Sequence, residues 1–145
     1  MTVRPIPEGY RTLTPGMSVR GANKAVDFFK RAFGAEERHR FTLPDGTLIQ
    51  ADMQLGDSNF VVGEVMPGTQ PRQLHAQLFV EDCDAMVQRA VEAGATLKEP
   101  VTLKWYGNRT GRIIDPFDNE WLISTRVEDV SDEEMRRRFE AMTRR

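Results

Sequence analysis

Residues 105–125 read WYGNRTGRIIDPFDNEWLIST, and this stretch decides the fold. The apolar pair at 113–114 is typical of a buried strand, and the Asp-Pro pair at 115–116 predicts a turn because proline cannot continue strand pairing. Residues 121–124 then predict the start of another strand. The stretch is therefore a predicted hairpin whose turns place polar side chains beside buried strands.

A helical stripe occurs once in each half of the chain. Residues 21–33 and residues 82–93 both place apolar side chains at i, i+3, i+4, i+7 and i+8, the spacing of one buried helix face. A glycine follows each stripe, and Gly34 and Gly94 lie 60 residues apart. The chain is thus predicted to repeat one unit with a period of about 60 residues.

Each predicted helix has one strand before it and three after it. Turn signals such as the Pro-Asp-Gly at 44–46 separate the strands. Both halves therefore read βαβββ, and each half is expected to need the other to bury its sheet. In the first half, strands are predicted at 11–19, 36–43, 47–55 and 59–64. In the second half, they are predicted at 73–80 and 96–104, at a segment that includes 113–114, and at 121–125.

The domain organisation follows from this repeat. We expect an extended arm at 1–10, a single domain at 11–126 and a helical tail at 127–145. Within the domain, the halves cover about 11–66 and 73–126, joined by a Pro/Gly linker without core residues. In the tail, Ser131 and Glu134 form a predicted capping box, and apolar residues on one side, including Phe139 and Met142, need a surface to cover.

Composition and charge exclude several classes of protein. Twenty basic and 22 acidic residues give a net charge of −2, which offers nothing to attract nucleic acid or an anionic membrane. No apolar run is long enough to span a bilayer, and the first residues lack the apolar core of a signal peptide. A single cysteine, Cys83, cannot form an internal disulfide, so a cytoplasmic location is expected. Its acidic neighbours argue against a nucleophilic thiolate.

The 105–121 segment resembles the W/F-Y-G-D-R-x-G-x-x-x-D-P-F-G-H-x-W segment of the vicinal oxygen chelate (VOC) superfamily, in its PhnB-like branch. That superfamily contains glyoxalases, bleomycin-resistance proteins and dioxygenases. The resemblance implies an α+β fold in which duplicated βαβββ modules form a cupped eight-stranded mixed sheet, here with a C-terminal helix added. The chain departs from the pattern at Asn108, Asp118 and Asn119, and Asp118 is expected to retain the turn because aspartate tolerates a positive φ.

The resemblance also indicates where a metal site would lie, but most residues at those positions cannot bind a metal. Metal-using members hold a divalent ion at four strand positions, which match Thr14, Val61, His75 and Leu122 in this chain. His75 is placed by HAQLFVEDCDA, which resembles the family's H-x-x-x-x-V-x-D-x-D-A. A divalent cation needs three or more nitrogen, oxygen or sulfur ligands, and valine and leucine supply none. With three of the four positions lost, we expect no metal and no other cofactor.

His75 remains a candidate for ligand binding or catalysis. Strand alternation places Gln77 and Phe79 on the same face as His75, where they can hydrogen-bond and stack on a small molecule. Leu122 is expected to contact the same ligand. The alternative is a buried histidine that only satisfies neighbouring backbone groups.

Asp52 is a second candidate, because a carboxylate close to His75 could assist proton abstraction. His39 lies in a charged strand and is expected to be solvated, and Glu64 is expected to be a strand-end surface charge. In the hairpin stretch, Trp105 and Tyr106 could stack a planar ligand.

Arg109 has two interpretations, both starting from its match to the family segment. It could bind an anionic ligand at the mouth of the cup, or it could form a charge-assisted bond with Asp115 that holds the turn.

Three hypotheses of function follow. The first is a metal-free small-molecule binding protein that sequesters its ligand, as resistance proteins do. The second is a metal-independent isomerase or lyase with His75 as general base, assisted by Asp52 or Arg109; the third is a metal-dependent glyoxalase-like or dioxygenase-like enzyme. Whether the protein is an enzyme stays open at this point. The resemblance also implies a homodimer, with the tail helix covering the partner.

Overall fold

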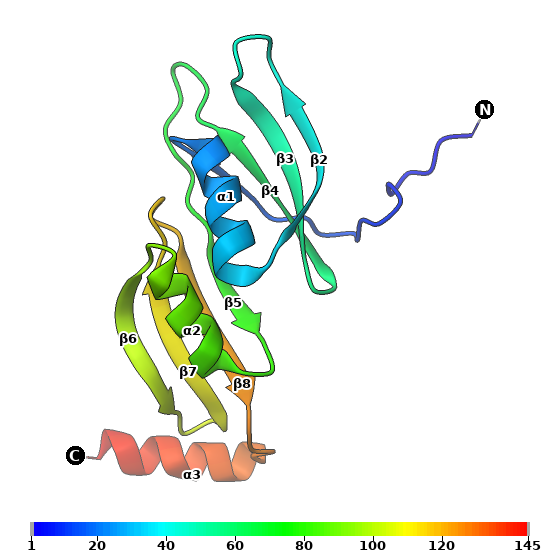
Figure 1. Ribbon diagram of the computed structural model, residues 1–145. Helices are drawn as coiled ribbons and strands as arrows, with labels where there is room; N and C mark the ends of the chain where they lie inside the picture. The colour runs from blue at the N-terminus through cyan, green and yellow to red at the C-terminus, as the bar shows by residue number, and fades with distance from the viewer. Residues whose placement is uncertain (1, 145) are drawn as a thin grey trace. The chain divides into compact units, whose positions relative to one another are not determined.

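The computed structural model of the chain describes residues 2–144 (Figure 1). The described chain confirms the predicted α+β class, the two βαβββ modules and the C-terminal helix. Its elements are β1 (Gly16–Val19), α1 (Ala22–Phe33), β2 (Glu36–Thr42), β3 (Leu48–Leu55), β4 (Ser58–Glu64), β5 (His75–Phe79), α2 (Cys83–Glu92), β6 (Thr96–Leu103), β7 (Asn108–Ile114), β8 (Glu120–Arg126) and α3 (Asp132–Thr143).

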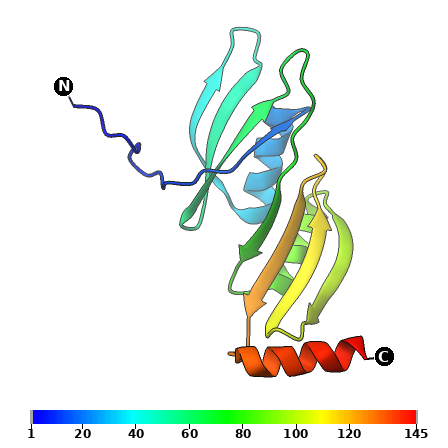
Figure 2. The ribbon, with the colours of Figure 1, turned by 180° about the vertical axis from the view of Figure 1, so that it is seen from behind.

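The eight strands form two sheets of four with the same topology. Their orders are β1-β4-β3-β2 and β5-β8-β7-β6. The first strand of each module pairs in parallel with the last, and the other pairings are antiparallel. Figures 1 and 2 show α1 and α2 each lying against one face of its own sheet. The repeat predicted from spacing is therefore a repeat of strand order as well.

The chain divides into two compact units, and each unit is made of two separate stretches of the sequence. Unit 1 contains the described residues up to Leu74 together with Pro116–Asn119, and unit 2 contains His75–Asp115 and the described residues from Glu120 onward. The β7–β8 turn thus belongs to unit 1, although its two strands belong to unit 2. The expectation of one domain at 11–126 with a shared core stays a prediction.

Side chains of the β7–β8 turn are part of the unit 1 core. The ring of Phe117 packs edge-on against Phe28 of α1, with centroids 6.5 Å apart. Asn119 is fully buried, and its side-chain oxygen accepts a hydrogen bond from the Leu74 amide at 2.7 Å. Asp118 between them has φ of 69°, so the expectation that aspartate would retain this turn is confirmed.

The first predicted strand, 11–19, was too long. Only Gly16–Val19 pairs as β1, and the side chain of Leu13 is 81% exposed. Pro15 has no amide hydrogen to donate, so the ladder begins after it, although the Pro15 carbonyl still accepts from Val61.

The stripe predicted for α1 is buried, whereas the stripe predicted for α2 is buried only in part, since Val91 at its end is 39% exposed. In unit 1, Phe29 is fully buried and packs edge-on against Phe60 of β4, and Gly34 ends α1 in the left-handed conformation. In unit 2, Cys83, Val87 and Ala90 form the buried side of α2. In each unit, one sheet face is covered by the unit's own helix, and the candidate site residues are therefore sought on the opposite face.

Candidate functional site

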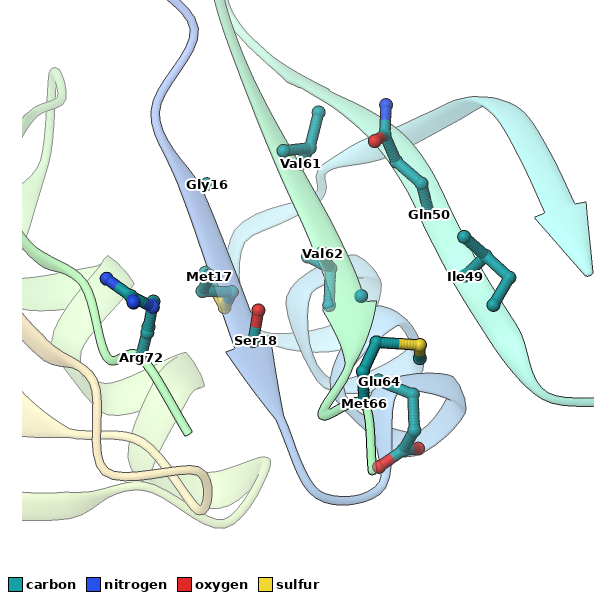
Figure 3. Close-up of a pocket in the computed structure, with 11 residues that line it drawn as sticks. Gly16, Met17, Ser18, Ile49, Gln50, Val61, Val62, Glu64, Met66 and Arg72 are labelled. Carbon is teal, nitrogen blue, oxygen red and sulfur yellow. The ribbon is translucent and has the colours of Figure 1, made fainter. Parts of the chain in front are cut away.

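Unit 1 has a pocket on the sheet face that points away from α1. Met17 and Val62 point toward the helix and are buried, so their strand neighbours Gly16, Ser18 and Val61 point the other way. The pocket on this face, called here the unit 1 pocket, has a volume of about 340 Å³. Figure 3 shows its lining, which comes from β1, β3 and β4 with Met66 and Arg72 of the following segment.

Glycines keep this face open. A Cβ atom on Gly63 would lie 2.4 Å from the carbonyl oxygen of Ile49, and a Cβ on Gly16 would lie 2.7 Å from the Val61 side chain. Both distances are shorter than real Cβ contacts. Alanine at either position would therefore force these neighbouring groups apart. Backbone thus forms part of the pocket wall.

Glu64 lines the pocket but performs a structural task. Its carboxylate accepts hydrogen bonds from the amides of Gly21 and Ala22, both at 3.1 Å, at the start of α1. Gly21 itself has no side chain to cap the helix, and the first amides of a helix lack partners within it. The expectation that Glu64 would be a surface charge was therefore wrong, because its partner is a helix start that is distant in sequence.

Arg72 and Met66 were missed by the sequence reasoning, which expected only a linker there. The backbone of Arg72 bonds to that of Ser18 in both directions, at 3.0 and 2.9 Å, and so extends the sheet beyond β1. A single bridge has no alternating apolar pattern around it, so it could not be predicted from the sequence.

Asp52 has its own network on the same face of unit 1. It accepts a hydrogen bond from Gln50 at 2.9 Å and another from the phenol of Tyr10, and the His39 ring nitrogen Nδ1 lies 3.8 Å from its Oδ2. Burial, this hydrogen bond and the Asp52 charge raise the pKa of Tyr10 from 10.0 to about 12. The side chain of His39 is 69% exposed, in line with the solvated face predicted for it.

In unit 2, His75 lies on the sheet face that points away from α2. Gln77 and Phe79 share this face, as strand alternation predicted, opposite Leu122 and its neighbours on β8. His75 Nε2 lies 2.9 Å from the Oε2 atom of Glu120, and the histidine side chain is 63% exposed. Such exposure does not suit the alternative of a buried core histidine.

Glu120 is the carboxylate partner that sequence reasoning did not name. Lys98 also donates to it, and Arg112 Nη1 lies 3.4 Å from its Oε2 atom. The Lys98 hydrogen bond lowers the pKa of Glu120, with further contributions from the charges of Lys98, His75 and Arg112. The alternation around Leu122 could have revealed it, because Glu120 lies two residues earlier and so on the same face.

A polar ladder lies beside these charges. The Gln77 amide donates to the hydroxyl of Ser124 at 3.2 Å, and the hydroxyls of Ser124 and Thr110 are 3.0 Å apart. Both hydroxyl-bearing residues are fully buried. Gln77 is thereby held across the sheet face on which His75 lies.

Arg109 is not on the His75 face. On β7 it alternates with the buried Thr110, and its guanidinium pairs with Asp84 of α2, Nη2 to Oδ1, at 2.8 Å. The bond expected with Asp115 is replaced as well, because Asp115 accepts from the indole of Trp121 at 2.9 Å. Arg109 and Arg112 are three residues apart on β7, and this odd separation places Arg109 on the helix side and Arg112 on the His75 side.

The aromatic pair also has a partner within the chain. Trp105 packs edge-on against Tyr106 and against Phe139 of α3, with ring centroids 5.1 and 5.3 Å apart. Its carbonyl accepts a hydrogen bond from Arg138 at 3.1 Å. The tail helix thus docks on the surface that was expected to stack a ligand.

The four residues that match the superfamily's metal site fall in both units, and Thr14 lies before β1 instead of on a strand. Thr14 and Val61 belong to unit 1, whereas His75 and Leu122 belong to unit 2. Val61 lines the unit 1 pocket, and Leu122 lies between Gln77 and Arg112 in the strand register. The residues present do not fit a divalent ion, since two of the four are aliphatic.

Comparison with known proteins agrees with the fold. The sequence model of the glyoxalase-like domain matches residues 16–124. The chain belongs to the glyoxalase-like domain family. An uncharacterised Mycobacterium bovis protein, Mb0911c, is 32% identical over 136 residues, covering 85% of this chain and 88% of that protein.

Two solved structures show the same fold at lower identity. A glyoxalase/bleomycin resistance protein/dioxygenase family enzyme from Burkholderia phytofirmans has a TM-score of 0.64 and 19% identity, covering 77% of this chain and 95% of its own. A PhnB protein from Bacillus cereus, described as a putative methyltransferase, has a TM-score of 0.59 and 15% identity, covering 79% and 99%. The glyoxalase-like part of the VOC resemblance is confirmed. Its PhnB-like branch stays a prediction. Within residues 2–144, no helix is long and apolar enough to cross a membrane.

The Tyr10–Asp52 contact generates a prediction on pH. Because the folded chain favours the neutral phenol, its contribution to stability is complete below pH 10 and declines as the pH rises from 10 to about 12. In a Tyr106→Phe background, which leaves Tyr10 as the remaining tyrosine, about a tenth of the phenol should be ionised at pH 11 by absorbance at 295 nm. Asp52→Asn should raise that fraction. Equal ionisation of about nine-tenths in both proteins would contradict the contact.

Proposed function

We propose that this protein is a small-molecule binding protein of the glyoxalase/bleomycin-resistance type, which sequesters its ligand without the superfamily's metal ion. The observation that carries the proposal is the unit 1 pocket, because Val61 occupies a metal-ligand position and lines a cavity of about 340 Å³. An aliphatic side chain there removes a ligand from the metal and adds an apolar contact for an organic molecule.

The make-up of both open faces supports this proposal. The unit 1 pocket combines apolar side chains with a few polar groups, which is typical of small-molecule sites. In unit 2, Gln77, Phe79 and Leu122 share one sheet face with His75, and Phe79 is 60% exposed. An amide held by Ser124 and an exposed ring suit hydrogen bonding and stacking.

Metal content tests the first part of this proposal. Because Val61 and Leu122 cannot ligate, protein purified without chelators is expected to hold less than about 0.1 equivalent of zinc, nickel, iron or manganese. Adding about 100 μM zinc should shift the melting temperature by less than about 1 °C, since an ion that does not bind the native state cannot stabilise it. One equivalent of metal per chain, retained after dialysis, would return the metal-dependent enzyme as the leading function.

A second candidate function is a metal-independent isomerase or lyase with His75 as general base. The contact between His75 Nε2 and Glu120 favours it, because a carboxylate that accepts from Nε2–H leaves Nδ1 free to take a proton. Asp52 and Arg109, the assisting residues favoured by the sequence, have partners in their own units. Glu120 is the assisting residue that we propose in their place.

Hydrogen–deuterium exchange distinguishes the two candidates. If His75 is a base, the protein should catalyse exchange of the acidic carbon-bound protons of dihydroxyacetone in D₂O, followed by NMR. His75→Ala should then lower the rate by about 100-fold or more, and Glu120→Gln by a smaller factor. His39→Ala is the matched control and should change nothing. An exchange rate no higher than that in buffer would contradict the catalytic candidate and leave binding as the proposed function.

We also propose a cytoplasmic homodimer in which α3 contributes to the shared surface. Although Phe139 contacts Trp105, Phe139 and Met142 remain 46% and 48% exposed, which is more apolar surface than a helix end needs. The family resemblance supports the same assembly.

Light scattering checks the assembly. The expected mass at micromolar concentration is twice the 16.5 kDa of the chain. Replacing both Phe139 and Met142 with serine should raise the monomer fraction, because an interface of standard size depends on a few buried apolar anchors. A monomer in the unchanged protein would end the dimer proposal.

A further inference from the structure

The two charged residues of the unit 1 pocket differ in whether their side chains already have partners within the protein. Two of its lining residues are of acidic or basic type, Glu64 and Arg72. Figure 3 draws Arg72 beside β1 and Glu64 at the end of β4. Which of them is available to a ligand decides the charge that the pocket selects.

Glu64 is committed to the protein. Its two carboxylate oxygens accept from the amides of Gly21 and Ala22 at 3.1 to 3.2 Å. These amides lie at the positive end of the α1 dipole, which offsets the carboxylate charge. A cationic ligand that bound Glu64 would have to compete with the start of the helix.

Arg72 is uncommitted at its guanidinium but fixed at its backbone. Two backbone hydrogen bonds with Ser18, at 3.0 and 2.9 Å, hold the residue against β1. Among residues 2–144, no ion pair or hydrogen bond occupies its side chain. It is also the single cationic side chain of the pocket lining in this described part of the chain. The pocket therefore presents an anchored positive charge without a counter-ion.

The remaining lining describes the rest of the ligand. Ile49, Val61 and Met66 offer apolar surface, and Ser18 and Gln50 add polar groups. A volume of about 340 Å³ lies at the lower end of the range for small-molecule sites, which favours a small ligand.

We propose that the unit 1 pocket binds a small organic acid, with its carboxylate on the Arg72 guanidinium and its apolar body against Ile49, Val61 and Met66. The planar guanidinium can donate two parallel hydrogen bonds to a carboxylate, which a neutral amide or an amine cannot match. This inference rests on the proposed binding function and adds the charge class of the ligand to it.

Three probes of one shape and different charge test the proposal. They are 4-phenylbutyrate, the neutral 4-phenylbutyramide and the cationic 4-phenylbutylamine, titrated into ¹⁵N-labelled full-length protein and followed at the amides of Ser18, Gly63 and Arg72. The carboxylate is expected to bind about tenfold more tightly than the amide, and the amine most weakly. Arg72→Gln should bring the carboxylate to the affinity of the amide and leave the amide unchanged.

Two control variants separate charge from geometry and from overall electrostatics. Arg72→Lys keeps the charge without the planar fork and should retain only part of the preference. Arg20→Gln removes an exposed arginine of unit 1 that is outside the pocket lining, and it should leave the preference intact. Amide spectra of each variant without probe establish that it is folded.

The outcomes distinguish this inference from the proposed function. If the three probes bind the pocket equally, or if Arg72→Gln retains the carboxylate preference, the assignment of Arg72 is wrong and the pocket stands as a binding site. If no probe shifts the pocket amides at millimolar concentration, both the acid specificity and the binding function of this pocket are overturned.

Discussion

Parallel pairing of the first strand of each module with its last strand is the constraint on which the rest of this structure depends. A parallel pair cannot be joined by a tight turn, so the chain must leave β1, cross by α1 and two further strands, and return as β4. The crossing helix covers one face of the sheet. The other face carries no helix of its own module, and it is there that the unit 1 pocket and the His75–Glu120 pair are found.

The open faces also explain why loss of a metal site need not mean loss of a ligand site. In a metal-using relative of this superfamily, the inward strand positions must carry nitrogen or oxygen ligands. In this chain valine and leucine stand at two of them, so these positions offer apolar side chains, and under the proposed function recognition depends on the polar residues around them. In unit 1 these are Ser18, Gln50 and Arg72, none of which belongs to the family segment that identified the fold.

Features set by local periodicity could be predicted from the sequence, and features set by single long-range contacts could not. The helix stripes and the 60-residue repeat gave both modules, and strand alternation placed His75, Gln77 and Phe79 on one face. Arg109 was predicted from its match to the family segment to bind a ligand or to pair with Asp115. Strand alternation instead places it on the side of α2, where it pairs with Asp84.

The role of Glu64 depends on a helix start 43 residues away, and that of Arg72 on one bridge to Ser18, so neither leaves a pattern in its neighbourhood. These two residues nevertheless decide the charge of the unit 1 pocket. Under the proposed function, the residues that leave no pattern in the sequence are therefore the ones that would select the ligand.

The place of the β7–β8 turn has a consequence for how the chain is made. Unit 1 includes the Phe117 ring, which packs against Phe28, and the buried Asn119, so its own contiguous stretch ends at Leu74 while these two residues are encoded more than 40 residues later. During translation from the N-terminus, the ribosome must add almost all of unit 2's β-strands before unit 1 can be completed. Although the two modules repeat each other, the first module is not complete when its own stretch has been translated. A gene divided between the modules would also encode an incomplete unit 1.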